Sequence, residues 1–244
     1  MKITHSLLVV LTTLTLLHTP AVFAEHPKSF SSAKSTANKL YQTHLKNFYC
    51  NCDLKPNARK RNKLEPRFKF CGYEARVPIT KKGKNNARAK RIEWEHVMPA
   101  WVFGHQRGCW QSGGRKNCSK SDRVFKLMES DLHNLVPAVG ELNGDRSNFR
   151  FAMVPGEPRK YGACDFEVDF KGRKAEPPEG IRGDISRIYF YMAKKYKLKL
   201  SKSQKQLFNA WDKLDPVSPW ECRRDGLITG SQGNSNSYVS EKCE

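Results

Sequence analysis

A glutamate stands directly beside a histidine at Glu95-His96, in a chain of 244 residues with a formal net charge of +20. A carboxylate is a hard oxygen donor that suits Mg²⁺ or Ca²⁺, and a neutral imidazole can accept a proton from water near neutral pH. The positive charge of the chain favours a polyanionic substrate. Together these features indicate metal-assisted hydrolysis of a phosphodiester, although a satisfied core histidine and a surface carboxylate are commoner uses of these residues.

The two side chains can serve one site only if the backbone bends or ends beside them. Residues 91–97 alternate in polarity and predict a strand, and neighbours in a strand point to opposite faces. Pro99 follows at once and is expected to end the strand. The site should therefore lie at the end of this strand.

Further oxygen donors and cations follow the Glu-His pair. Acidic and amide residues are concentrated in residues 128–137 and again in residues 141–148. Between these stretches and the pair, Arg115 follows Gly113-Gly114, and such a flexible backbone can present the guanidinium to a phosphate. The chain thus offers the groups that phosphodiester hydrolysis requires.

Basic residues are unevenly distributed along the chain. Lys and Arg number 44 against 24 Asp and Glu, with one cluster in residues 55–69 and a second in residues 81–91. The second cluster leads directly into the expected strand. This excess predicts attraction to nucleic acid, anionic lipid or cell-wall polymer, and a track of cations leading to the site suits a phosphate backbone.

The first 24 residues have the pattern of a cleaved secretory signal peptide. Lys2 is followed by a short apolar run and by small residues that end at Ala24. The apolar run is too short and too interrupted for a membrane anchor, and no later segment is a candidate. We therefore expect a signal peptide over residues 1–24, a single domain over residues 25–244, a periplasmic or secreted location, and a monomer.

Eight cysteines follow the proposed cleavage point, and an even number in an exported chain predicts disulfides. Cys109 and Cys118 bracket a glycine-rich turn and form the one favoured pair. Cys50 and Cys52 are too close to bridge each other and should have different partners. A zinc site is the less favoured alternative because paired Cys-x-x-Cys units are absent from the sequence.

Periodicity and turn residues predict an α+β fold that is stabilised by disulfides. Residues from about 226 form a polar tail, which Cys243 should tie down. We expect helices at residues 33–49, 122–140 (broken at Pro137), 184–196 and 203–214, strands at 68–70, 75–79, 91–97 and 165–170, and a loop over 106–121.

Several long motifs in this order resemble the bacterial endonuclease I family, and the resemblance covers most of the chain after residue 24. The resemblance implies a ββα-metal (His-Me finger) core and a periplasmic or secreted nuclease without sequence specificity. The motifs are Glu93-Trp94-Glu95-His96-Val97, Pro99-Ala100-Trp101, Gly104-His105-Gln106-Arg107, Gly113-Gly114-Arg115-Lys116-Asn117-Cys118, Met128-Glu129, Asp131-Leu132-His133-Asn134-Leu135 and Asn143-Gly144-Asp145-Arg146-Ser147-Asn148.

The resemblance also implies a role for each site residue. His96 is the general base, while Glu95 and Asn143 hold one Mg²⁺, for which Ca²⁺ or Mn²⁺ can substitute. Arg115 stabilises the phosphate or the cleaved product, and Glu129 orients His96 or pairs with Arg115. The expected substrates are double- and single-stranded DNA and RNA, bound through the phosphate backbone and cut to 5′-phosphate products.

Three other functions remain open from the sequence. Charge alone equally supports an exported DNA-binding protein without catalysis, which would not need the Glu-His pair. A metal-free ribonuclease would use His96 with His133 as acid and base. A cationic cell-wall hydrolase would use paired carboxylates such as Glu129 and Asp131.

Overall fold

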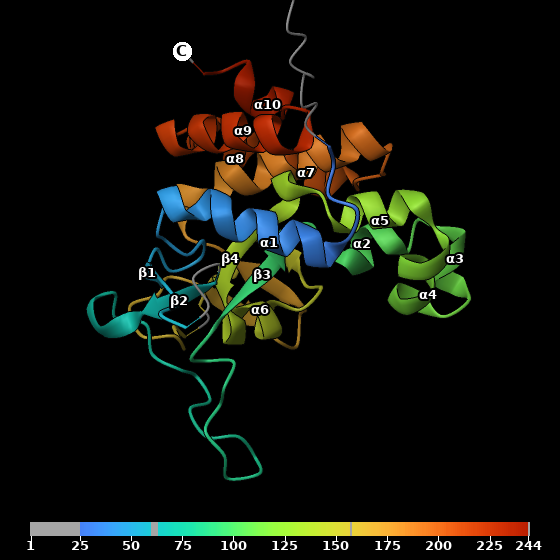
Figure 1. Ribbon diagram of the computed structural model, residues 1–244. Coiled ribbons are helices and arrows are strands. Elements are labelled where there is room, and N and C mark those ends of the chain that lie inside the picture. The colour runs from blue at the N-terminus through green and yellow to red at the C-terminus, as the bar shows by residue number, and fades with distance from the viewer. Residues whose placement is uncertain (1–24, 60–62, 157, 244) are drawn as a thin grey trace, which may run out of the picture.

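Short strands and many helices build a mixed α+β fold, as expected (Figure 1). The computed structural model describes residues 25–59, 63–156 and 158–243, so the expected signal peptide lies outside the described residues. Within the described ranges, no helix has the length and apolar character that crossing a membrane requires.

Two antiparallel strands lie at the centre of the fold. β3 (Ile92–His96) pairs with β4 (Leu135–Val139), so that Glu95 is opposite Val136. Helix α6 (Gly140–Arg146) follows β4 without a loop and contacts both strands. The predicted strand at residues 91–97 is therefore confirmed, and Glu95 and His96 lie at its end.

The helix expected over residues 122–140 is wrong beyond its first half. α5 (Arg123–Glu129) ends before a 3-10 turn, η3 (Leu132–Asn134), and the chain then enters the fully buried strand β4. Pro137 lies inside β4 and does not break a helix. A two-stranded sheet tolerates a proline because both of its strands are edge strands.

The loop expected over residues 106–121 is also wrong, because short helices cross this region. α2 (Ala100–Gly104) is followed by α3 (Gly108–Gln111) and α4 (Gly114–Ser121). The positive φ angles of Gly113 and Gly114 make the sharp turn into α4. The Cys109–Cys118 disulfide, the favoured pair, ties α3 to α4.

The N-terminal region begins with α1 (Phe30–Leu40), which Ser29 caps and which buries Ala33 and Ala37. This helix is shorter than the expected 33–49, because a 3-10 turn, η1 (Tyr41–Thr43), ends it. A hairpin of β1 (Asp53–Pro56) and β2 (Leu64–Arg67) follows. The strand expected at 68–70 is a 3-10 turn, η2 (Phe68–Phe70), and no named strand covers 75–79.

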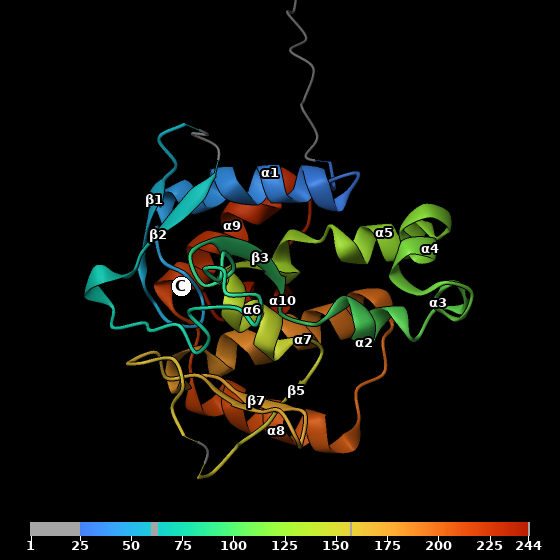
Figure 2. The same cartoon turned by 90° about the horizontal axis from the view of Figure 1, so that it is seen from below.

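The basic segment between η2 and β3 projects away from the body of the molecule (Figure 1). On the other side of the strand pair from α1, β5 (Arg150–Phe151), β6 (Glu167–Asp169) and β7 (Lys174–Glu176) form a small sheet beside α8 (Lys202–Leu214) (Figure 2). The strand expected near residues 165–170 is thus confirmed as β6.

Long helices form the C-terminal part. A 3-10 turn, η4 (Glu179–Ile181), leads into α7 (Arg182–Tyr196), which packs against α8. These two helices confirm the predictions at residues 184–196 and 203–214. Ile185 and Met192 of α7 belong to the main hydrophobic core, which also contains Val136 of β4 and Leu142 of α6. Helix α7 is thus part of the core that β4 and α6 also form.

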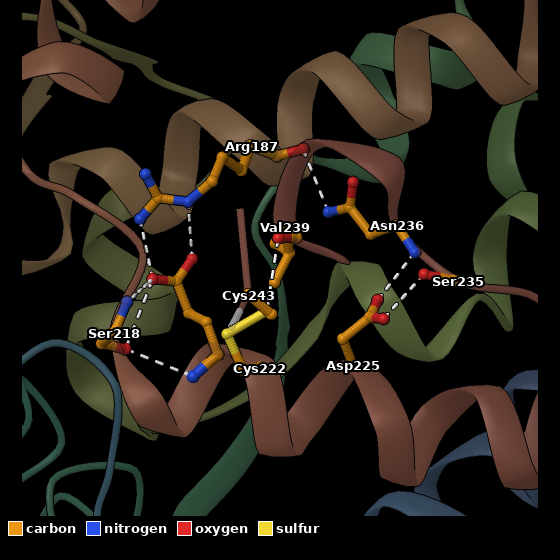
Figure 3. Close-up of a disulfide and its surroundings, with 9 residues drawn as sticks. Arg187, Ser218, Cys222, Asp225, Ser235, Asn236, Val239 and Cys243 are labelled. Carbon is orange, nitrogen blue, oxygen red and sulfur yellow. Dashed lines mark hydrogen bonds and ion pairs between the residues drawn. A yellow bond between two sulfur atoms is a disulfide. The ribbon is translucent and has the colours of Figure 1, made fainter. Parts of the chain in front are cut away.

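The C-terminal tail is helical and covalently tied. α9 (Pro219–Gln232) is followed by α10 (Ser237–Ser240), and the Cys222–Cys243 disulfide joins α9 to the segment just after α10 (Figure 3). Cys243 therefore ties down the tail, as expected. Cys50 pairs with Cys164 and Cys52 with Cys71, which confirms that the two close cysteines have different partners.

Candidate active site

A cavity of about 820 Å³ opens along β3 and brings together residues that are far apart in the sequence. Glu95, His96, Arg115 and Asn143 all line it. Glu129 does not line the cavity but contacts two residues that do. The structure thus assembles in one place all five residues that the sequence analysis assigned to the site.

His96 is held in one orientation and one protonation state. Its Nε2 lies 2.8 Å from the backbone carbonyl oxygen of Glu129. A carbonyl can only accept, so Nε2 donates and Nδ1 keeps its lone pair. The ring packs against Phe30 at 4.7 Å between centroids, and burial lowers the pKa of His96 to about 3. The imidazole is therefore a neutral acceptor at ordinary pH.

The carboxylate of Glu95 is almost fully buried at the end of β3, with 3 % of the residue exposed. Its Oε1 accepts hydrogen bonds from the Tyr49 hydroxyl at 3.1 Å and from Arg146 Nη1 at 3.0 Å. Its Oε2 accepts none from the described residues. Burial raises the pKa of Glu95 to about 7, and the charge of Arg146 opposes this rise.

Asn143 reaches the same cavity from α6. Its Nδ2 donates to Glu93 Oε2 at 3.1 Å, which orients the amide and leaves Oδ1 without a hydrogen bond to any described residue. Glu93 is held in turn by Arg88 and Arg91, at 2.6 and 2.5 Å. One carboxylate oxygen and one amide oxygen are therefore uncommitted beside the cavity.

Arg115 is joined to Glu129 by a short ion pair. Its Nε lies 2.7 Å from Glu129 Oε1, and Ser119 donates to the other carboxylate oxygen at 3.0 Å. Neither Nη group of Arg115 has a hydrogen bond to a described residue, and 47 % of the side chain is exposed. Glu129 thus contacts His96 through its backbone and Arg115 through its side chain, so both contacts expected as alternatives occur.

Two residues that contact the site were not identified from the sequence. Tyr49 and Arg146 bind Glu95, yet neither had been given a role. Arg146 stands three residues after Asn143, one helical turn further on, and this spacing is a signal that could have identified it. Tyr49 is separated from Glu95 by 46 residues, and no local pattern indicates the contact.

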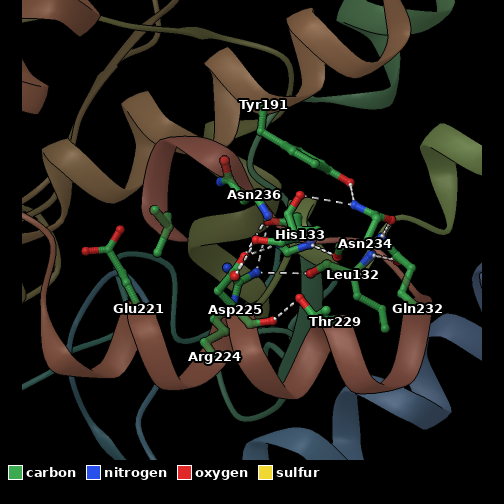
Figure 4. Close-up of polar contacts among 12 residues, drawn as sticks. Leu132, His133, Tyr191, Glu221, Arg224, Asp225, Thr229, Gln232, Asn234 and Asn236 are labelled. Carbon is green, nitrogen blue, oxygen red and sulfur yellow. Dashed lines mark hydrogen bonds and ion pairs between the residues drawn. The ribbon is translucent and has the colours of Figure 1, made fainter. Parts of the chain in front are cut away.

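The residues that two of the alternative functions would need, His133 and Asp131, bind other partners. His133 (Figure 4) is buried, and its ring nitrogens face the Asn234 carbonyl oxygen at 2.9 Å and Asp225 at 3.7 Å. It does not line the cavity beside His96. Asp131 is fully buried among tyrosines and Lys195, so it is no free partner for Glu129. The geometry therefore supports neither the pairing of His96 with His133 nor the pairing of Glu129 with Asp131.

A metal at this cavity would have few protein ligands. Within the described ranges, no group of three or more His, Cys, Asp or Glu side chains is arranged to hold a metal ion. All eight cysteines are in disulfides, which leaves none for zinc. The uncommitted Glu95 and Asn143 oxygens are hard donors, and they fit a cation such as Mg²⁺ that keeps most of its waters.

Comparison with known proteins agrees with this arrangement. The chain is 48% identical over 232 residues to an extracellular deoxyribonuclease of Aeromonas hydrophila, covering 95% of this chain and 96% of the relative. A periplasmic deoxyribonuclease of the same species is 47% identical, with 95% and 93% covered. Endonuclease-1 of Buchnera aphidicola is 47% identical, with 88% and 82% covered.

The names of the two Aeromonas relatives describe them as extracellular and periplasmic, which confirms the prediction of an exported protein. The family model described as Endonuclease I matches residues 28–243, which is nearly the whole chain after the expected signal peptide. The resemblance noted in the sequence is therefore confirmed, and the chain belongs to the endonuclease I family.

Proposed function

We propose that the protein is a Mg²⁺-dependent endonuclease that hydrolyses phosphodiester bonds of DNA and RNA without sequence preference and leaves 5′-phosphates. The observation that carries the proposal is that a neutral imidazole, two uncommitted oxygen donors and an arginine line one cavity. The family membership supports nuclease activity, and the names of the relatives support DNA as a substrate.

The catalytic core is proposed to be a ββα-metal unit. The order of β3, β4 and α6 supports this assignment, because α6 follows the antiparallel pair directly and contacts both strands. In this unit, β3 contributes Glu95 and His96, and α6 contributes Asn143. The unit would be the centre of a single exported domain that begins at residue 25 and acts as a monomer.

Glu95 Oε2 and Asn143 Oδ1 would hold the cation, with Ca²⁺ or Mn²⁺ as possible substitutes for Mg²⁺. When bound, the cation supplies positive charge that stabilises the developing charge on the phosphate. A donor set of one carboxylate and one neutral amide leaves most of that charge available to the substrate. The hydrogen bonds that Asn143 donates to Glu93 and that Arg146 donates to Glu95 orient the two ligands.

His96 would act as the general base. Its Nδ1 takes a proton from the attacking water, since Nε2 already donates to the Glu129 carbonyl. A base whose pKa is lowered to about 3 stays neutral at physiological pH, but its driving force for proton removal is small. Neighbouring positive charge at the phosphate would compensate by making the attacking water more acidic.

Arg115 would bind a phosphate oxygen through its Nη groups, while Glu129 holds its Nε. Cations around the cavity would track the rest of the backbone. Such contacts carry no base information, so cleavage should show little sequence preference. Among the residues that the structure describes, the cations that line the cavity are Lys34, Lys63, Arg88, Arg91 and Arg115.

The competing function that charge alone supports is DNA binding without catalysis. Plasmid incubated with Mg²⁺ and then with excess EDTA separates the two. The proposal predicts degradation only with metal, with RNA degraded as well and with new ends that carry 5′-phosphates. Retention on DNA without any cleavage in Mg²⁺, Mn²⁺ or Ca²⁺ would favour the binding protein.

A further inference from the structure

We propose that Tyr49 and Arg146 are positioning residues that occupy Oε1 of Glu95 and thereby present Oε2 as the single oxygen for the metal. This inference rests on the metal site of the proposed function. It concerns two residues that do not themselves line the cavity. Both contact the side chain of Glu95, and Arg146 also contacts the backbone at the end of β3.

The side chain of Tyr49 makes one hydrogen bond with the described residues, from its hydroxyl to Glu95 Oε1 at 3.1 Å. The residue is 1 % exposed, and its ring packs on Phe166 at 4.5 Å between centroids. The neighbouring Cys50 is bonded to Cys164, so the disulfide fixes the backbone beside Tyr49. The hydroxyl is therefore delivered to Glu95 by a rigid support, and Glu95 is its only recipient among these residues.

Arg146 binds the same oxygen of Glu95 from α6. It is fully buried at the end of α6, and its Nη1 lies 3.0 Å from Glu95 Oε1 and 3.1 Å from the His96 carbonyl oxygen. Its Nη2 binds the Val97 carbonyl oxygen at 2.6 Å and the Tyr189 hydroxyl at 3.2 Å. One guanidinium thus joins the helix of Asn143 to the end of the strand of Glu95.

Neighbouring residues in a strand point to opposite faces, and these contacts explain how Glu95 and His96 can nevertheless serve one site. Arg146 binds the carbonyls of His96 and Val97 where β3 ends, which fixes the backbone at the bend. Two donors on Oε1 oppose rotation of the carboxylate, because turning it would break both bonds. Glu95 would consequently bind the metal through one oxygen, in a fixed direction.

Tyr49→Phe removes only the hydroxyl and keeps the packing, so it is the sharpest test. Isothermal titration with Mg²⁺ alone should give an affinity weaker by about 10-fold, at the low end of losses for groups that orient metal ligands. Activation by Mg²⁺ should shift by the same factor, with kcat at saturating Mg²⁺ nearly unchanged. Mg²⁺ affinity equal to that of the wild type would overturn the inference.

Tyr73→Phe is the matched control. Tyr73 is also buried, and its hydroxyl donates to a carboxylate, Glu141 Oε2, at 2.8 Å. Glu141 does not line the cavity, so this variant should lose stability in thermal unfolding without a change in Mg²⁺ affinity. An equal loss of Mg²⁺ affinity in both variants would indicate a general structural effect and would overturn the positioning role.

Arg146→Lys and Arg146→Met provide a second series. Lysine keeps a charged donor for Glu95 but not the fork that reaches the two carbonyls, so Mg²⁺ affinity should fall in the order wild type, lysine, methionine. If the Arg146 variants do not fold, the result for Tyr49→Phe alone decides the inference. If the wild-type protein binds no Mg²⁺, the proposed function is overturned as well. If the wild type binds Mg²⁺ and Tyr49→Phe binds it equally tightly, only this inference is overturned.

Discussion

His96 Nε2 donates to the backbone carbonyl oxygen of Glu129 at 2.8 Å. This contact joins β3 to the end of α5 across 33 residues of sequence and fixes which ring nitrogen can accept a proton. Because the acceptor is backbone, changes to the Glu129 side chain should leave the His96 tautomer intact. Glu129 thus positions two residues in separable ways: it holds His96, the proposed base, through its backbone, and Arg115, the proposed phosphate ligand, through its side chain.

Replacing Arg115 by alanine should reduce kcat by about 10²–10³, the usual loss for one group that stabilises transition-state charge. Lys116→Ala is the matched control, since it removes the same charge from the exposed neighbouring position. Steady-state cleavage of a fluorescent duplex measures both. Similar losses in the two variants would mean that Arg115 contributes only general attraction.

The loss of activity at acidic pH should follow Glu95 and not His96. The pKa of Glu95 is raised to about 7 by burial, whereas that of His96 is lowered to about 3, so of these two residues only Glu95 changes charge between pH 5 and 8. A protonated carboxyl cannot bind the cation, so Mg²⁺ affinity should fall by about tenfold per pH unit below pH 7. Rates measured across a Mg²⁺ series at each pH should recover at high Mg²⁺. An acid limb that extra Mg²⁺ does not move would contradict this assignment.

Lys34 on α1 should contribute to binding of the phosphate backbone. It lines the cavity, whereas Lys39 on the same helix is exposed and does not. Lys34→Ala should lower the slope of log affinity against log salt by about one, and Lys39→Ala should not. Fluorescence anisotropy with DNA in EDTA, where cleavage is prevented, measures the slope. Identical slopes for the two variants would remove Lys34 from the DNA-contacting surface.

Removal of different disulfides should lower the free energy of unfolding by different amounts. Cys50–Cys164 closes a separation of 114 residues and Cys222–Cys243 one of 21. Chain entropy predicts losses of about 5 and about 3 kcal/mol for the double serine variants. Only loss of Cys50–Cys164 should also weaken Mg²⁺ binding, because Tyr49 adjoins it. Thermal unfolding and Mg²⁺ titration distinguish the two.

Dependence of folding on the disulfides would offer a reason for their presence in an exported nuclease. If folding requires them, the precursor stays inactive in the reducing cytosol, where it would threaten the cell's own DNA. Reduced and alkylated protein should therefore lose its activity on plasmid. Full activity after reduction and alkylation would count against this protective role.

The site was largely accessible from the sequence because its chemistry is carried by residue types in local motifs. Glu95 and His96 stand out by residue type, as an oxygen donor and a base. Asn143 precedes Gly144 and on its own indicates a turn, so its role came only from the resemblance to the family. Tyr49 was not accessible, since its contact depends on a disulfide between residues 114 positions apart. The sequence states neither the pairing nor the direction in which the hydroxyl points.

The errors in the fold have physical causes of the same kind. The run Leu135–Val139 is wholly apolar, and an apolar run alone does not distinguish a buried strand from a buried helix. The pairing with β3 decides it. The helices α3 and α4 form in a glycine-rich, polar segment because the Cys109–Cys118 disulfide and the Asn117 side chain, which donates to the Cys109 carbonyl, hold the turn.

Single-turnover cleavage and Mg²⁺ titration on the same His96→Ala protein test most directly whether a base and a cation act at one cavity. The expected result is a cleavage rate lower by about 10²–10⁴, with Mg²⁺ affinity near that of the wild type. His105→Ala, an exposed histidine outside the cavity, should cleave normally. A His96→Ala protein that cleaves DNA at close to the wild-type rate would contradict the account.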